Sequence, residues 1–187
     1  MSTFREAVWE AVPAGAVPEA FAARRAFLLA RLPPGARVVD VGCGDGAFAA
    51  ELVARGAEVV GVDVATGALE RARAAVPGAE FRLAVEDDEL PVEDGWANLV
   101  WVGEVLEHAV DVVGLLLEAR RVLAPGGRLV ATTPAHGPLL TRVSHLDPFA
   151  DHLRFFTARS LRAVLATAGF ERIEMRRRRG RLFACAS

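Results

Sequence analysis

A glycine-rich segment flanked by acidic residues is the part of this sequence that points most directly to chemistry. It reads Val39-Asp40-Val41-Gly42-Cys43-Gly44-Asp45-Gly46 and lies where a short β-branched run turns into a predicted helix. Glycines let the backbone approach a ligand closely, and parallel sheets bind ligands at this carboxyl edge. Gly42, Gly44 and Ala47 also satisfy the looser dinucleotide pattern G-x-G-x-x-G/A, so a nicotinamide-dinucleotide site is the first alternative.

The charges beside this loop argue against a dinucleotide. A dinucleotide places its pyrophosphate against the amides at a helix start, where Asp40 and Asp45 would repel it. The same carboxylates suit a ligand that carries an ammonium and a sulfonium group, with the glycine amides facing the ligand's carboxylate. S-adenosylmethionine has these groups. Asp63, 17 residues after Gly46, is suited to accept hydrogen bonds from both ribose hydroxyls, a role that dinucleotide sites share.

The apolar pattern predicts the elements that hold this loop. Strands are expected at 37–42, 58–63, 79–85, 96–102 and 128–133, and helices between and after them at 46–55, 66–75, 111–123 and 157–168. Such βαβ alternation predicts a parallel sheet with helices on both faces. Two final strands at 170–178 and 181–186 are joined by a short turn with Gly180, which predicts an antiparallel pair.

Composition and charge narrow the functional class. The 187 residues are 52% hydrophobic and 25% charged, which fits one globular domain, with a helical cap at 1–35 and the core at 36–187. A net charge of -2 lacks the broad positive surface that binds nucleic acid or anionic lipid, so we expect a small-molecule partner. Without a membrane-length apolar run or a secretion signal, the chain is predicted to be cytoplasmic, with Cys43 and Cys185 reduced.

Besides the glycine-rich segment, the sequence contains five further motifs. They are Val60-Gly61-Val62-Asp63, Leu90-Pro91, Glu104-Val105-Leu106-Glu107-His108, Arg121-Val122-Leu123-Ala124-Pro125-Gly126-Gly127-Arg128-Leu129 and His152-Leu153-Arg154-Phe155-Phe156-Thr157. Together with residues 39–46, these motifs resemble those of class I S-adenosylmethionine-dependent methyltransferases, especially the small-molecule type 11 group similar to ubiquinone and menaquinone biosynthesis enzymes. The resemblance implies a doubly wound α/β fold with a seven-stranded sheet in the order 3-2-1-4-5-7-6 and an antiparallel last strand.

The resemblance also implies which residues bind the cofactor S-adenosyl-L-methionine. An acidic residue four positions before Leu90 should accept a hydrogen bond from the adenine amino group; that position is Glu86, with Asp87 as the second choice. Asp63 is the expected ribose acid. The remaining implied contacts are Asp40, Gly42, Cys43, Gly44, Asp45, Val64, Gly103 and Glu104.

Methyl transfer from a sulfonium is an in-line displacement at carbon, so alignment and desolvation supply most of the acceleration. A hydroxyl or protonated amine acceptor also needs a base, for which histidine is suited. The candidates are His108 after the fourth strand, His136 in the predicted substrate loop 135–156, and His152. Similar Glu and His residues bind metal in some quinone-forming relatives, but the same pattern is common without one, so we predict no metal.

Several alternatives stay open. The main hypothesis is an enzyme that methylates an oxygen or nitrogen atom of a small molecule, and the acceptor and oligomeric state are not predicted. Against a nucleic-acid methyltransferase, strand four ends in Val102-Gly103-Glu104-Val105 and not in the Asn/Asp-Pro-Pro-aromatic set. The run Arg176 to Arg179 is predicted to be a solvated strand edge. The other two hypotheses are a protein methyltransferase and a cofactor-binding protein without catalysis.

Overall fold

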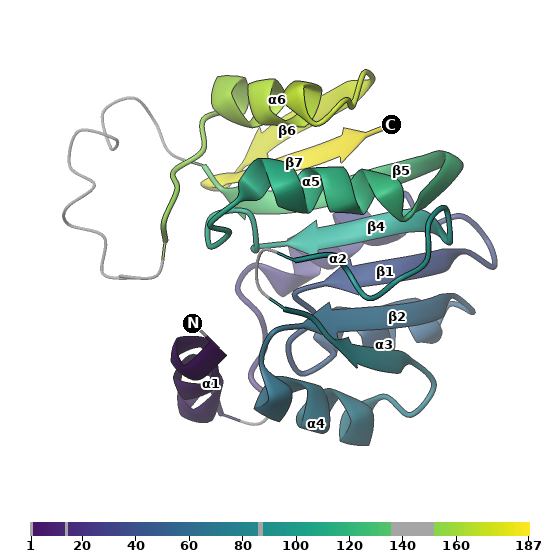
Figure 1. Cartoon of the computed structure of the whole chain (residues 1–187), viewed down its shortest axis with the longest axis vertical. Helices are drawn as coiled ribbons and strands as arrows, with labels where there is room; N and C mark the ends of the chain where they lie inside the picture. Colours follow the sequence, from purple (N-terminus) through teal and green to yellow (C-terminus); the bar gives the residue numbers. More distant parts are fainter. Residues whose placement is uncertain (1, 14, 86–87, 136–151) are drawn as a thin grey trace.

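The computed structural model describes residues 2–13, 15–85, 88–135 and 152–187, and a seven-stranded sheet forms its centre (Figure 1). The strand order is β3-β2-β1-β4-β5-β7-β6, and only β7 runs antiparallel to its neighbours. This confirms the doubly wound α/β fold. The strands are β1 (Arg37–Val41), β2 (Glu58–Asp63), β3 (Glu80–Leu83), β4 (Ala97–Gly103), β5 (Leu123–Pro134), β6 (Ile173–Arg178) and β7 (Arg181–Ala186).

Helices cover both faces of the sheet. The apolar side chains of α5 (Val112–Arg121) and α6 (Ala158–Thr167) join one core layer, and those of α2 (Phe21–Leu29), α3 (Ala47–Val53) and α4 (Thr66–Ala75) join the other. The remaining helix, α1 (Ser2–Ala11), packs on α4 at the edge where the arrowheads of β1, β2 and β4 point (Figure 1). Among the described residues, no helix has the length and apolar character of a bilayer span.

The central strands are buried because both of their faces are covered. In β4, Leu99, Val100 and Val102 are fully buried, and Trp101 is 1% exposed. The Trp101 ring packs against Phe48 of α3, with 5.1 Å between centroids. A continuous apolar run is typical of a parallel strand with helices on both sides. The carboxyl ends of β1, β2 and β4 are thereby fixed relative to one another.

Side-chain caps start the last two helices where the sequence predicts them. Thr157 caps α6: its hydroxyl accepts a hydrogen bond from the Ser160 amide, and the Ser160 hydroxyl accepts one from the Thr157 amide. Asp111 caps α5 by accepting a hydrogen bond of 2.9 Å from the Gly114 amide. Such caps satisfy amides that lack a partner in the first helical turn.

The boundary between α5 and β5 differs from the prediction. The expected helix to Leu123 ends at Arg121, and β5 begins at Leu123 and not at Arg128. Ala97 pairs with Leu123 while Leu99 pairs with Arg128, so residues 124–127 form a bulge within the strand. Pro125-Gly126-Gly127 therefore lies inside the strand, and not between the predicted helix at 111–123 and the predicted strand at 128–133.

Candidate active site

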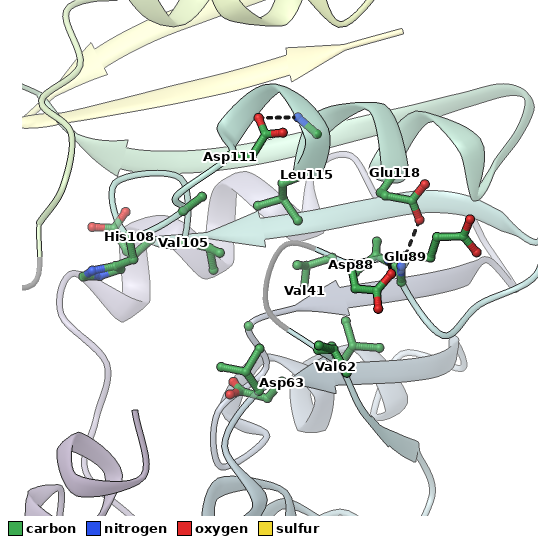
Figure 2. A pocket seen from close by; sticks show the side chains of 18 of the residues that line it. Val41, Val62, Asp63, Asp88, Glu89, Val105, His108, Asp111, Leu115 and Glu118 are labelled. Atoms are coloured by element: carbon green, nitrogen blue, oxygen red, sulfur yellow. Dashed lines mark hydrogen bonds between the residues drawn. The ribbon is translucent and has the colours of Figure 1, made fainter. Parts of the chain in front are cut away.

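A cavity of about 580 Å³ opens at the carboxyl edge of β1, β2 and β4. Figure 2 shows Asp63 from β2, His108 from the turn after β4 and Asp111 from the start of α5 around it. Five of the predicted site residues line its wall: Gly42, Asp63, Val64, Glu104 and His108. We call the two regions of the site the glycine-loop end (Gly42, Gly44, Asp63) and the histidine end (Glu107, His108, His152). Gly42, Asp63 and His108 line the cavity, and the other three residues lie next to them.

The glycine-loop end requires glycine at two positions. Gly42 and Gly44 have φ angles of 67° and 55°, in the left-handed region that L side chains rarely adopt. A Cβ atom on Gly42 would come within 2.4 Å of Val105 Cγ2, and one on Gly44 within 2.4 Å of the Trp9 ring. Side chains at these positions would therefore strain the backbone and collide with the wall.

Asp63 organises the loop through both carboxylate oxygens. Oδ2 accepts a hydrogen bond of 2.9 Å from the Gly44 amide, and Oδ1 accepts one of 3.0 Å from the Ala65 amide. The amides of Gly42 and Cys43 donate to the Val62 carbonyl. The loop amides that we expected to face a ligand carboxylate are thus bonded to protein oxygens. The side chain of Asp63 itself lines the cavity at the end of β2.

Asp40 lies behind the loop and not in the cavity wall of the described residues. It is 1% exposed, and its Oδ2 atom has no hydrogen-bond partner among them. Its pKa is raised to about 8, chiefly by burial; the charge of Arg24 opposes the rise, and that of Asp63 adds to it. Such a carboxyl is protonated at neutral pH until a nearby cation favours the charged form.

Four other predicted contacts also lie outside the wall of the described residues. Cys43 is buried against α3 and α4 in the core, where burial raises the pKa of its thiol. Gly44 is buried beside Trp9. Asp45 and Gly103 are partly exposed at the ends of the glycine loop and of β4. The structure thus brings some of the predicted residues to the cavity and places the others in the shell behind it.

Glu104 combines an uncommon backbone conformation with a carboxylate that lies near two arginines. Its φ angle is 59°, which costs a non-glycine residue about 1 to 3 kcal/mol. Arg181 Nε donates to Glu104 Oε2 at 2.8 Å, and Arg24 Nε lies 4.0 Å from Oε1. Arg181 also pairs with Glu19 at 2.8 Å. Burial lowers the pKa of Arg181, but Glu19 and Glu104 outweigh burial and raise it overall.

Sequence reasoning missed Arg24, although a signal for it existed. Arg24 is 4% exposed, donates to Thr132 Oγ1 at 3.2 Å and lies over the Phe48 ring, 4.7 Å from its centroid. It occupies the apolar stripe of α2 between Phe21 and Leu28, where an arginine is buried only with a specific partner.

At the histidine end, three side chains from two segments meet. The rings of His108 and His152 are 4.8 Å apart between centroids, and one ligand atom each from Glu107, His108 and His152 lies within 4.8 Å of the others. Glu107, also missed as a site residue, is 2% exposed and accepts a hydrogen bond from Thr133 Oγ1. Burial raises its pKa to about 8, and the charge of Glu104 adds to the rise. The set has the composition of a cation site; the absence of a metal stays a prediction.

The helix α1 closes one side of the cavity. Glu6 accepts hydrogen bonds from the Thr66 and Gly67 amides at 2.5 and 3.1 Å and so caps α4 from a distance. Arg71 donates to the carbonyls of Trp9 and Val12. The cavity wall thereby gains the side chains of Val8, Trp9 and Val12.

Some predicted residues lie outside the described part of the chain. These are Glu86, Asp87, His136 and residues 136–151 of the predicted substrate loop 135–156. Their described neighbours Asp88 and Glu89 line the cavity beside the end of β3. The adenine contact and the role of the loop stay predictions.

Comparison with known proteins identifies the family. A family model described as a methyltransferase domain matches residues 14–175. The chain belongs to the methyltransferases. This confirms the resemblance to class I S-adenosylmethionine-dependent methyltransferases that the motifs indicated, and S-adenosyl-L-methionine is the cofactor of this family.

Curated relatives and a solved structure agree with that assignment. A probable S-adenosylmethionine-dependent methyltransferase of Mycolicibacterium smegmatis is 36% identical over 148 residues, which cover 76% of this chain and 55% of that protein. A ubiquinone biosynthesis O-methyltransferase of Psychrobacter arcticus is 30% identical over 159 residues, covering 74% and 60%. An S-adenosylmethionine-dependent methyltransferase from Mesorhizobium loti superposes with a TM-score of 0.74 at 25% identity, covering 92% and 98%. The chain thus spans about half the length of the curated relatives.

The cavity of this methyltransferase fits its cofactor. Glu104 Oε1, in the wall, and Asp40 Oδ2, buried behind it, are carboxyl oxygens without a hydrogen-bond partner among the described residues, as expected near a cationic ligand. Gly42 brings backbone to the cavity wall where a larger side chain would collide with Val105. Asp63 provides a carboxylate in the wall for hydroxyl groups.

Proposed function

We propose that this chain transfers a methyl group from S-adenosyl-L-methionine to the oxygen or nitrogen atom of a small molecule. The observation that carries the proposal is that a single cavity connects Asp63 and Gly42 with His108. One end has the carboxylate and glycine loop for a nucleoside with an amino-acid arm, and the other has an imidazole. A donor and an acceptor in one cavity meet the alignment requirement of in-line displacement.

At the glycine-loop end, Asp63 would hold the ribose hydroxyls, and Asp88 or Glu89 borders the region assigned to adenine. Asp40 and Glu104 place two carboxylates behind and beside the loop, where they would balance the ammonium and sulfonium charges. Arg24 and Arg181 keep Glu104 in place. When bound, the cofactor supplies a methyl group that its sulfonium already activates.

At the histidine end, His108 lines the cavity and is the proposed base, and His152 packs against its ring. An imidazole accepts a proton near neutral pH, which a hydroxyl or ammonium acceptor must lose when it attacks carbon. The walls from α1 and from Val105 and Ala109 exclude water from the reacting groups.

The acceptor is proposed to be a small molecule, since the cavity is enclosed by α1 on one side and α5 on the other. A cytoplasmic location is part of the proposal and is supported by the free thiols of Cys43 and Cys185, which fit a reducing compartment.

The experiment is a titration of the purified protein with S-adenosylhomocysteine, followed by an assay of methyl transfer to a set of small hydroxyl and amine compounds. We expect binding in the micromolar range and release of S-adenosylhomocysteine with an acceptor. Binding without methyl transfer to any acceptor would favour the non-catalytic alternative. The absence of binding would overturn the proposal.

A further inference from the structure

The ionisable side chains in the cavity wall are strongly biased in sign. Within residues 2–13, 15–85, 88–135 and 152–187, the wall contains His108 but neither lysine nor arginine. Six acidic residues line it: Asp63, Asp88, Glu89, Glu104, Asp111 and Glu118. A cleft lined by one sign of charge concentrates ligands of the opposite sign.

The arginines that balance two of these acids stand outside the wall. Arg181 pairs with Glu104 at 2.8 Å, and Arg121 pairs with Glu118 at 2.7 Å and also donates to the Leu90 carbonyl. Both guanidinium groups are therefore committed to protein carboxylates and are not presented to a ligand. A carboxylate or phosphate on the acceptor would meet carboxylates there, and the described part of the wall offers it neither lysine nor arginine to pair with.

The cavity wall also has an apolar and aromatic surface. Val105 and Ala109 from the turn after β4 line it, as do Val8 and Trp9 of α1 and Val12 just after that helix. The Trp9 ring lies beside Gly44 at the glycine-loop end. An indole face attracts a cation within about 6 Å of the ring. The walls therefore suit a ligand with an apolar body and a positive group.

Asp111 is the acid of the wall that comes from the same turn as His108. Figure 2 shows it at the start of α5, where its Oδ1 accepts a hydrogen bond from the Gly114 amide. An aspartate at this position caps the helix and also brings a negative charge to the histidine side of the cavity. An asparagine would keep the cap and lose the charge, because both residues are good helix N-caps.

We infer that the methyl acceptor is a small amine with an apolar body, which enters as an ammonium ion, and that the cavity disfavours acceptors with a carboxylate or phosphate. This inference rests on the proposed function and specifies its substrate class. The ammonium first gives one proton to His108. The nitrogen lone pair then forms a bond to the methyl carbon, and the carbon–sulfur bond breaks with its electron pair on sulfur. The products are the N-methylammonium compound, S-adenosylhomocysteine and one proton, which His108 passes to water.

The test compares matched acceptors that differ only in the reacting group. The first set is 2-phenylethylamine, 2-phenylethanol and 3-phenylpropanoate; the second is tryptamine, tryptophol and indole-3-propanoate. Formation of S-adenosylhomocysteine is measured, and kcat/KM is compared within each set. We expect the amine to exceed the alcohol at least tenfold in at least one set, and the carboxylate to be inert.

A pair of variants tests the role of the charge. Asp111→Asn should raise KM for the amine at least fivefold with little change in kcat, and leave the affinity for S-adenosylhomocysteine unchanged. Glu58→Gln removes the same charge from an exposed site at the opposite edge of the sheet, where β2 begins, and should leave KM unchanged. An effect of overall charge would move both variants alike and contradict the assignment.

Three results would overturn the inference while the proposed function stands. These are a carboxylate or alcohol turned over faster than its matched amine, an Asp111→Asn variant with unchanged KM for the amine, and a protein that binds S-adenosylhomocysteine but methylates none of the amines. A protein that does not bind S-adenosylhomocysteine at all overturns the proposed function itself.

Discussion

The glycine-loop end and the histidine end of the cavity are held by different kinds of interaction. At the first, Asp63 accepts hydrogen bonds from two backbone amides close to it in the fold, and glycines with positive φ set the path of the chain. At the second, Glu107, His108 and His152 meet through side chains from segments more than 40 residues apart. A site built by backbone geometry suits the methyl donor, which is common to the family. A site built by side-chain contacts can differ between family members that methylate different acceptors.

The largest effect is expected at the histidine end. His108→Ala removes the proposed base, and kcat should fall about 100-fold or more because proton transfer by a positioned side chain contributes at least that much. The affinity for S-adenosylhomocysteine should not change, since the glycine-loop end is intact. His152→Ala is the comparison and should cost less, because His152 contacts the His108 ring but is not part of the described cavity wall. Equal kcat values for His108→Ala and the unchanged protein would show that His108 is not the base.

The next effect is expected at the glycine-loop end. Asp63→Ala removes a charged acceptor of ribose hydroxyls and should weaken S-adenosylhomocysteine binding by roughly 2 to 4 kcal/mol, or about 30-fold and upward. It also leaves the Gly44 and Ala65 amides without their acceptor, so Tm should fall. Asp63→Asn keeps one carbonyl oxygen and should be intermediate in calorimetry. Undiminished affinity in Asp63→Ala contradicts the ribose role.

One buried carboxyl group near each end of the cavity, Asp40 and Glu107, should make the stability of the protein depend on pH in the same way. Asp40 and Glu107 each have a pKa raised to about 8, so the folded protein keeps protons that the unfolded chain loses near pH 4. Their contribution to stability is complete below pH 4 and is lost as the pH rises to about 8. Asp40→Asn and Glu107→Gln should each reduce the slope of the unfolding free energy between pH 5 and 8 by about 1 kcal/mol per pH unit. Denaturant titrations at several pH values measure this slope, and an unchanged slope means that the carboxyl is ionised at neutral pH.

The smallest effect is expected where α1 attaches. Glu6→Gln weakens the cap on the Thr66 and Gly67 amides, which lower the pKa of Glu6 by stabilising its charged form. Since α1 contributes Trp9 to the wall, we expect a few-fold loss of S-adenosylhomocysteine affinity and a small fall in Tm. Glu10→Gln, on the same helix, is the control. If both variants bind like the unchanged protein, α1 is not held in place by Glu6.

The fold was largely predictable because its signals are local. The alternation of short apolar strands with helical stretches gives the sheet, and Thr157 and the Gly180 turn mark element ends. The start of β5 was not predicted, because Pro125-Gly126-Gly127 has the same composition whether it separates two elements or bends one.

The site was predictable only in part, and for a related reason. The glycine loop and Asp63 are visible in sequence because turn geometry needs particular residue types at fixed spacing. The contacts of Arg24 with Thr132 and of Arg181 with Glu104 join residues 108 and 77 positions apart, and no local pattern encodes such pairs. Glu107 belongs to the motif at residues 104–108, but its burial depends on β5 and on the segment around His152, which no local pattern encodes.

The most direct test is calorimetry of the unmodified protein with S-adenosylhomocysteine and, separately, with NAD. A cavity whose described ionisable wall residues are acids and one histidine, organised by Asp63, should bind the thioether nucleoside in the micromolar range and give no heat with the diphosphate. Binding heat with NAD, together with no binding heat with S-adenosylhomocysteine, would contradict this assignment of the cavity.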